Sequence, residues 1–145
     1  MRNPIRRNRG PQRGSALIEF ALSIFMVVLL MFWVFEMVML VYTYSVLADA
    51  AKEGVRYAIV HGSGVAPANQ SGPGNTAAVS TVVTDYAQFS LHDVSAITVT
   101  PTYLNGDNQA PDLVQVTVSY TYIPYIKLPF TSPTINTSAE GRIVY

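Results

Sequence analysis

The side chains of this chain that could do acid–base chemistry or bind a metal are two histidines and nine carboxylates. Catalysis needs a nucleophile, a base and an orienting group placed together, or a metal site. His61 and His92 fall in separate predicted loop regions, and cysteine is absent, so a thiolate site and a disulfide are both excluded. The aspartates of the C-terminal part lack a ligand spacing such as D-x-D-x-D-G: Asp85, Asp93, Asp107 and Asp112. We therefore expect no enzyme activity, cofactor or metal.

Two other carboxylates border or interrupt a long apolar segment. From Phe20 to Val41 the only strongly polar residues are Ser23 and Glu36, and Glu19 directly precedes the segment. A carboxylate in or near hydrocarbon is costly and needs a partner. Glu36 lies about 30 Å along a helix that begins near Ala16, so we interpret it as an interfacial residue. Pairing with another subunit inside a helix bundle is the alternative.

The apolar segment itself predicts a membrane-spanning helix. Phe20–Val41 contains no Pro or Gly, and as a helix it is about 33 Å long, close to the thickness of the hydrocarbon core of a bilayer. A soluble core helix that is apolar on every face would need a large surrounding core, which the rest of the chain is too short to supply. The composition agrees, because 50% of residues are hydrophobic and only 12% are charged.

The net charge of zero conceals a polarised distribution. Five basic residues precede the first acidic one: Arg2, Arg6, Arg7, Arg9 and Arg13. An excess of Lys and Arg marks the cytoplasmic flank of a membrane helix. The remainder is mildly acidic and has too little basic charge for nucleic-acid binding. We expect the N-terminus in the cytoplasm and the C-terminal domain outside the cytoplasmic membrane.

A cleaved secretory signal is the alternative reading of this segment. Ala48-Asp49-Ala50 gives the small-x-small pattern that signal peptidase prefers. A usual signal, however, has an apolar stretch of only about 7–15 residues. This stretch is longer, and the tripeptide lies inside what reads as a continuing helix. The sequence therefore favours a permanent anchor.

Two motifs carry a resemblance to a known family. Residues 13–20 read RGSALIEF and residues 48–58 read ADAAKEGVRYA. The first resembles the processing site of type IV prepilin-like proteins, where a basic leader ends in Gly and a Glu follows after four small or apolar residues. It is particularly similar to the Tad/Flp pilus branch and its TadE-like minor pilins. The second resembles the Ala-rich end of that family's first helix, at the expected separation.

This resemblance implies a peptidase site between Gly14 and Ser15. Glycine has no side chain to obstruct an intramembrane peptidase and can break the helix there, and the cut would remove all five leading arginines. Glu19 would then be the fifth residue of the mature chain, followed by Phe20, and would assist subunit assembly by complementing the new terminal ammonium of a neighbouring subunit. Alternatively, Glu19 is an interfacial residue paired with Arg13 or with lipid headgroups.

The resemblance also implies partners and a role. The partners are the lipid bilayer, a prepilin peptidase, the major pilin, other minor pilins and the pilus assembly platform. The role is that of a minor pilin or pseudopilin of a Tad-type pilus, acting in assembly, initiation or adhesion. The alternative is an unprocessed single-pass module that is tethered to the membrane and binds a surface ligand, without nucleic acid or a small-molecule substrate. The N-terminal residue of the membrane-extracted protein would separate the two.

The first helix should continue beyond the membrane, because no stop signal appears before Gly62-Ser63-Gly64. We predict a helix over 15–60, about 65–70 Å long, with its membrane part at about 16–41, after a leader over 1–14. Its outer half carries an apolar stripe at spacings of three and four: Leu40, Tyr44, Leu47, Ala51, Val55 and Ala58. On the other face, Asp49–Lys52 and Glu53–Arg56 can form ion pairs.

The remaining residues, 61–145, predict a small extracytoplasmic α+β domain. Residues 62–75 read as a flexible loop, and Thr76–Ser90 as an amphipathic helix. The apolar positions of that helix are Val79, Val82, Val83, Tyr86 and Phe89. Together with the long first helix, this arrangement is typical of pilins.

Strand patterns follow in the last third of the chain. Residues 96–103 and 113–122 alternate, and 105–108 read as the turn between them. Pro124 and Pro129 interrupt the next segment, and residues 137–145 can return as an edge strand. We predict a mainly antiparallel sheet of three or four strands. Its tyrosines could form a binding surface, although Tyr also suits strands in general: Tyr103, Tyr120, Tyr122 and Tyr125.

Overall fold

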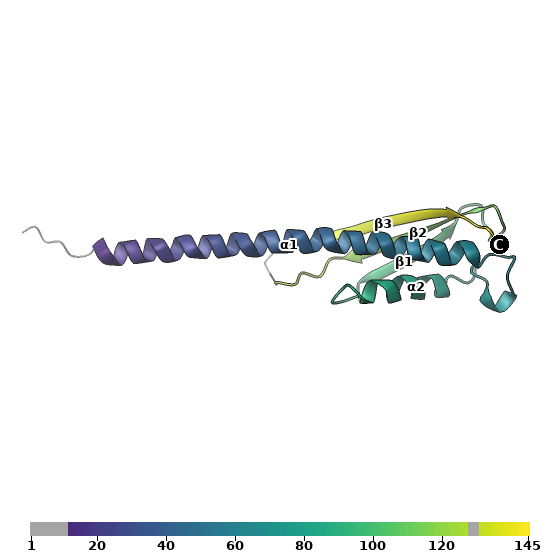
Figure 1. Ribbon diagram of the computed structural model, residues 1–145, viewed down its shortest axis with the longest axis horizontal. Helices are drawn as coiled ribbons and strands as arrows, with labels where there is room; N and C mark the ends of the chain where they lie inside the picture. Colours follow the sequence, from purple (N-terminus) through teal and green to yellow (C-terminus); the bar gives the residue numbers. More distant parts are fainter. Residues whose placement is uncertain (1–11, 128–130) are drawn as a thin grey trace, which may run out of the picture. The chain divides into compact units, whose positions relative to one another are not determined.

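The computed structural model describes residues 12–127 and 131–145, with side chains from Gly14 onward (Figure 1). The elements are α1 (Gln12–Val60), the short 3-10 helix η1 (Pro67–Asn69), α2 (Ala77–Gln88), β1 (Ile97–Tyr103), β2 (Leu113–Thr121) and β3 (Thr134–Arg142). This is the α+β class with a long N-terminal helix that the sequence predicts. The side chains of the leading arginines and the residues Pro129 and Phe130 lie outside the described residues.

Helix α1 extends over two compact units of the chain, which meet between Met37 and Val38. It begins at Gln12, three residues before the predicted start, and ends at Val60 as predicted. The break expected at Gly14 is absent, because Gly14 is helical. The described part of the first unit is this helix alone, and none of the residues that the structure describes buries its apolar window. It is therefore no core helix, and it is long and apolar enough to cross a membrane.

The second unit, which we call the body, contains an antiparallel sheet in the order β1-β2-β3. Its register pairs Thr100 with Thr117, and Thr117 with Ser138. Pro101 lies in β1, where a missing N–H donor is tolerated because β1 is an edge strand. The third strand begins at Thr134 and ends at Arg142, so the predicted edge strand exists but is shifted toward the N-terminus.

The core of the body lies between the inner face of the sheet, α2 and the second half of α1. The strongest alternation is in β2, where every second residue is buried: Val114, Val116, Val118 and Tyr120. Tyr103 and Tyr122 are buried too. These tyrosines belong to the core and not to an exposed binding surface, whereas Tyr125 is 37% exposed.

One residue of the predicted stripe, Tyr44, does not lie on the buried face of α1. Tyr44 is 53% exposed, and Thr43 and Val46 are buried instead. Thr43 can be buried because its hydroxyl donates to the Met39 carbonyl at 2.8 Å, so no polar atom is left unsatisfied. The two predicted ion pairs on the outer face are confirmed, each with an N–O distance of 2.9 Å: Asp49–Lys52 and Glu53–Arg56.

Helix α2 is confirmed but buries a narrower stripe than the sequence predicts. Val79, Val83 and Ala87 are fully buried, at every fourth position. Tyr86 is 40% exposed and Phe89, which follows the end of the helix, is 86% exposed. The expectation for these two aromatic residues is therefore wrong, because α2 contacts its neighbours along one row of small and branched side chains.

The segment 62–75 has more structure than the flexible loop that its composition indicates. It contains η1 and a bridge between Gly72 and Asn75. The Ser71 N–H donates to the His61 carbonyl at 2.7 Å, and the Ser63 N–H donates to the Asn108 carbonyl at 2.9 Å. Partners distant in the sequence thus hold this loop against the end of the sheet.

Candidate processing and assembly site

The predicted site residues lie on the first turns of α1. Ser15, Glu19 and Ser23 are spaced by four residues, so they form one polar row on a helix that is otherwise apolar in this region. All three are exposed, as are Gly14 and Phe20. The Ser23 hydroxyl donates to the Glu19 carbonyl oxygen at 2.8 Å, which satisfies it within the helix.

The Gly14–Ser15 peptide bond is helical in the structure, whereas a peptidase needs an accessible, locally extended chain. It lies in the first turn of α1, where the N–H groups have no intrahelical acceptor. Unwinding this turn therefore breaks few hydrogen bonds, and glycine lowers the cost further. A Cβ atom on Gly14 would contact nothing within 4 Å. The absence of a side chain here is thus not required by packing within this chain.

Glu19 carries the only charge that the structure places on the row Ser15–Glu19–Ser23. Its carboxylate receives no hydrogen bond or ion pair from the side chains that the structure describes, which begin at Gly14. Ser15 lies one helical turn before it on the same face. A terminal ammonium at Ser15, whether of the same chain or of a neighbouring one, is therefore chemically suited to meet this carboxylate.

Residues 14–56 match the family model described as TadE-like protein. This segment is similar to TadE-like proteins. This match confirms the resemblance, and it contains the Gly14–Glu19 motif together with most of the Ala-rich motif. The TadE-like segment covers less than half of the 145 residues, so most of the body lies outside it. No curated protein and no solved structure matches the chain.

The C-terminal end of the TadE-like segment is a packing surface. Ala50 and Ala51 of the segment and Ala58 just after it are fully buried, while Lys52 and Arg56 point outward in their ion pairs. Small side chains let α2 and the sheet approach the axis of α1 closely. The signal peptidase tripeptide Ala48-Asp49-Ala50 lies inside this packed helix, which argues against cleavage there.

Gly54 is a residue of the Ala-rich motif whose role the sequence did not reveal. A Cβ atom at Gly54 would lie 2.5 Å from Val83 Cγ2 of α2 and 3.3 Å from Val116 Cγ1 of β2. Three elements therefore meet at a position where only hydrogen fits. A glycine in mid-helix is the available sequence signal, because it costs helix stability unless packing requires it.

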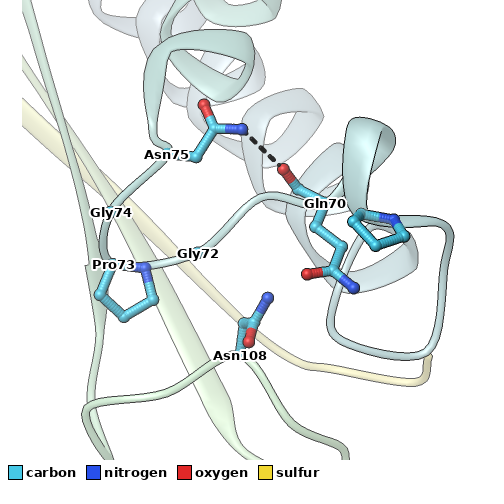
Figure 2. A pocket seen from close by; sticks show the side chains of 7 residues that line it. Gln70, Gly72, Pro73, Gly74, Asn75 and Asn108 are labelled. Carbon is cyan, nitrogen blue, oxygen red and sulfur yellow. Dashed lines mark hydrogen bonds between the residues drawn. The ribbon is translucent and has the colours of Figure 1, made fainter.

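A shallow pocket of about 260 Å³ lies in the loop before α2 (Figure 2). Its lining is uncharged: Pro67, Gln70, Gly72, Pro73, Gly74, Asn75 and Asn108. The amide groups donate to backbone carbonyls and fasten the loop, for example Asn108 Nδ2 to Ser71 O at 2.9 Å and Asn75 Nδ2 to Gln70 O at 2.9 Å. These groups therefore act as loop clamps, and the sequence could not reveal the partnership of Asn108.

The histidines occupy separate structural settings. His61 stacks on Tyr57 with ring centroids 3.9 Å apart, and its Nδ1 lies 2.8 Å from the Tyr57 carbonyl. His92 packs against Tyr125, with ring centroids 4.1 Å apart. Within residues 12–127 and 131–145, no group of three or more His, Asp, Glu or Cys side chains is placed to hold a metal ion.

Proposed function

We propose that this protein is a minor pilin or pseudopilin of a Tad-type pilus, with a structural role in assembly, initiation or adhesion and not a catalytic one. The TadE-like match indicates a pilin-like protein associated with a Tad pilus, and the apolar helix indicates a membrane anchor. The finer proposal adds a cut after Gly14, export of the body and incorporation of the mature chain among other pilin subunits.

One observation supports this proposal more than any other. The TadE-like segment begins at Gly14 and ends at Arg56, so it joins the proposed cleavage site, the membrane helix and the packing surface of the body on a single helix. In such an arrangement the first part of α1 is left to contact lipid or other subunits. Its exposed apolar side chains need such an environment in order to be stable.

The proposed partners follow from the same arrangement. A prepilin peptidase would act at Gly14–Ser15, the major pilin and other minor pilins would contact the row that contains Glu19, and the assembly platform would extract the helix from the bilayer. The cytoplasmic side for the N-terminus follows from the leading arginines. The competing proposal, an unprocessed tethered binding module, keeps its leader.

The mass of the membrane-extracted protein tests this function. With prepilin peptidase present, the mature chain should begin at Ser15. Gly14→Leu should remain full length in the membrane, because a branched side chain obstructs the peptidase at the cleaved bond. Gly10→Leu places the same side chain four residues earlier and should mature normally. Wild-type protein that keeps Met1, or normal shortening of Gly14→Leu, would contradict the proposal.

A further inference from the structure

The body carries exposed aromatic and cationic side chains at the end where α1 enters it at Val38. They come from three segments: the first turns of α1 within the body, the loop after α2 and the segment after β2. We call this set the exit rim, and it consists of Tyr42, Tyr44, Phe89, His92, Tyr125 and Lys127. All six side chains are exposed.

The direction of β2 places the C-terminal end of this strand near the point where α1 enters the body. Gly141 of β3 pairs with Val114, and a Cβ atom on Gly141 would contact Val55 of α1. Val116, two residues further along β2, packs next to Gly54 of α1. Strand β2 therefore runs toward lower residue numbers of α1.

The rise per residue shows how far β2 reaches. From Val116 to Tyr122 a strand advances about 20 Å, which equals roughly 13 residues of helix. Counted along α1 from Gly54 toward its N-terminus, this distance ends at Val41. Val41 is the last residue of the apolar segment, so the chain after Tyr122 begins at the height where the membrane part of α1 ends.

The loop after α2 lies beside the end of β2. The Tyr120 hydroxyl donates to the Asp93 carbonyl at 3.0 Å, and the His92 and Tyr125 rings are 4.1 Å apart. Figure 1 shows both connections on the side of the body opposite the C-terminus. Phe89 directly follows α2, at the start of this loop, and is 86% exposed.

The composition of the exit rim suits the headgroup region of a bilayer. Aromatic side chains with an apolar body and a polar tip are enriched at membrane–water interfaces, and Phe adds apolar area. Lys127 lies beside them, and a cationic group near a surface is attracted by anionic lipids. Of the carboxylates nearby, Asp93 is engaged by the Ser95 N–H at 2.8 Å.

We propose that the exit rim binds the headgroup region of the bilayer that α1 spans, so that the body rests on the membrane surface. Continuity with the apolar segment favours lipid over a second copy of the chain, because Tyr42 of the exit rim directly follows Val41, the last residue of that segment. The inference requires a membrane anchor, but it does not depend on the pilus role or on which side the body faces.

Tryptophan fluorescence tests the proposal with the full chain in phosphatidylcholine–phosphatidylglycerol vesicles. Trp33, the only tryptophan, is first replaced by Phe to give a silent background. Phe89→Trp and Tyr125→Trp then report from the exit rim. Leu104→Trp is the matched control, because Leu104 is 47% exposed and follows β1 at the other end of the sheet. Lipids with a spin label on the headgroup and aqueous iodide serve as the two quenchers.

The proposal expects opposite responses from the two ends of the body. Headgroup-labelled lipid should quench Phe89→Trp and Tyr125→Trp and leave Leu104→Trp unchanged, while iodide should quench Leu104→Trp far more than the rim probes. Equal iodide quenching at both ends would overturn the proposal. Rim probes that are shielded from iodide but insensitive to labelled lipid, or that lose their shielding when the protein is diluted in lipid, would also overturn it and indicate contact between protein copies.

Discussion

At the scale of single residues, Glu19 combines an exposed position with a chemical need for a partner. It lies beside the apolar segment, and a carboxylate near hydrocarbon costs several kcal/mol, on the order of 3, unless another charge meets it. The row that it shares with Ser15 places a terminal ammonium within one turn if the chain is cut after Gly14. In the proposed function, Glu19 would therefore link processing to assembly.

We expect Glu19→Gln to insert and mature normally but to be recovered less in sheared pili, and to crosslink less to the major pilin. The amide keeps the size of the side chain and removes the charge that would pair with the ammonium. Ser23→Ala is the control, because Ser23 lies on the same row one turn later and its hydroxyl bonds only within the helix. Wild-type incorporation of Glu19→Gln would show that Glu19 is merely interfacial.

Asp107 and Asp112 form a second residue-scale feature, in the turn between β1 and β2. Their shared hydrogen bond raises the pKa of Asp107 and lowers the pKa of Asp112, which the Asn105 amide lowers further. Because its folded pKa is raised, ionisation of Asp107 costs stability as the pH rises through that pKa. The contribution of Asp112 has the opposite sign: it is present above the unfolded pKa and is lost as the pH falls through the folded pKa.

Asp107→Asn supplies an N–H donor to Asp112 at every pH. We expect its melting temperature to exceed that of the wild type at pH 7, and the difference to shrink at an acidic pH below the raised pKa of Asp107, where Asp107 regains its proton. Thermal melts at both pH values in detergent measure this. A difference of equal size at both pH values would contradict the shared proton.

At the scale of elements, the contact between α1, α2 and β2 depends on Gly54. Alanine at this position would favour the helix by about 1 kcal/mol, while overpacking typically costs about 1–3 kcal/mol. The nearest atom belongs to a branched side chain, Val83, that is held in the core. The steric cost should therefore exceed the gain in helix propensity.

We expect Gly54→Ala to lower the free energy of unfolding of the body by about 1–2 kcal/mol, as measured by denaturant titration of the full chain in detergent. The loss should shrink in a Val83→Ala background, because the two sites share one contact. Gly74→Ala is the control, since a Cβ atom there meets nothing within 4 Å. An unchanged midpoint for Gly54→Ala would show that α2 shifts to make room.

At the scale of the whole molecule, we expect the polarised charge to determine which side of the membrane receives the body. Alkaline phosphatase fused after Tyr145 should be active, because the enzyme folds only outside the cytoplasm. The same enzyme fused after Gln12, before the apolar segment, should be inactive. A stable but inactive Tyr145 fusion would reverse the topology and remove the pilus proposal with it.

The sequence by itself determined the features that arise from neighbouring residues. These are α1 and α2, the alternating strands, the ion pairs on the outer face of α1 and the TadE-like motif. Each depends on contacts at spacings of two to four residues, which the order of amino acids fixes directly.

Only the tertiary structure decided which side chains the core accepts, because burial depends on partners that are distant in the sequence. Thr43 is buried and Tyr44 is exposed since the sheet and α2 approach α1 from particular sides. Phe89 lies beyond the end of α2 and joins the exit rim, and Asn108 fastens a loop 37 residues before it. The role of Gly54 was also decided by the tertiary structure. A local pattern indicates the cost of a glycine in a helix but not the neighbouring side chain that requires it.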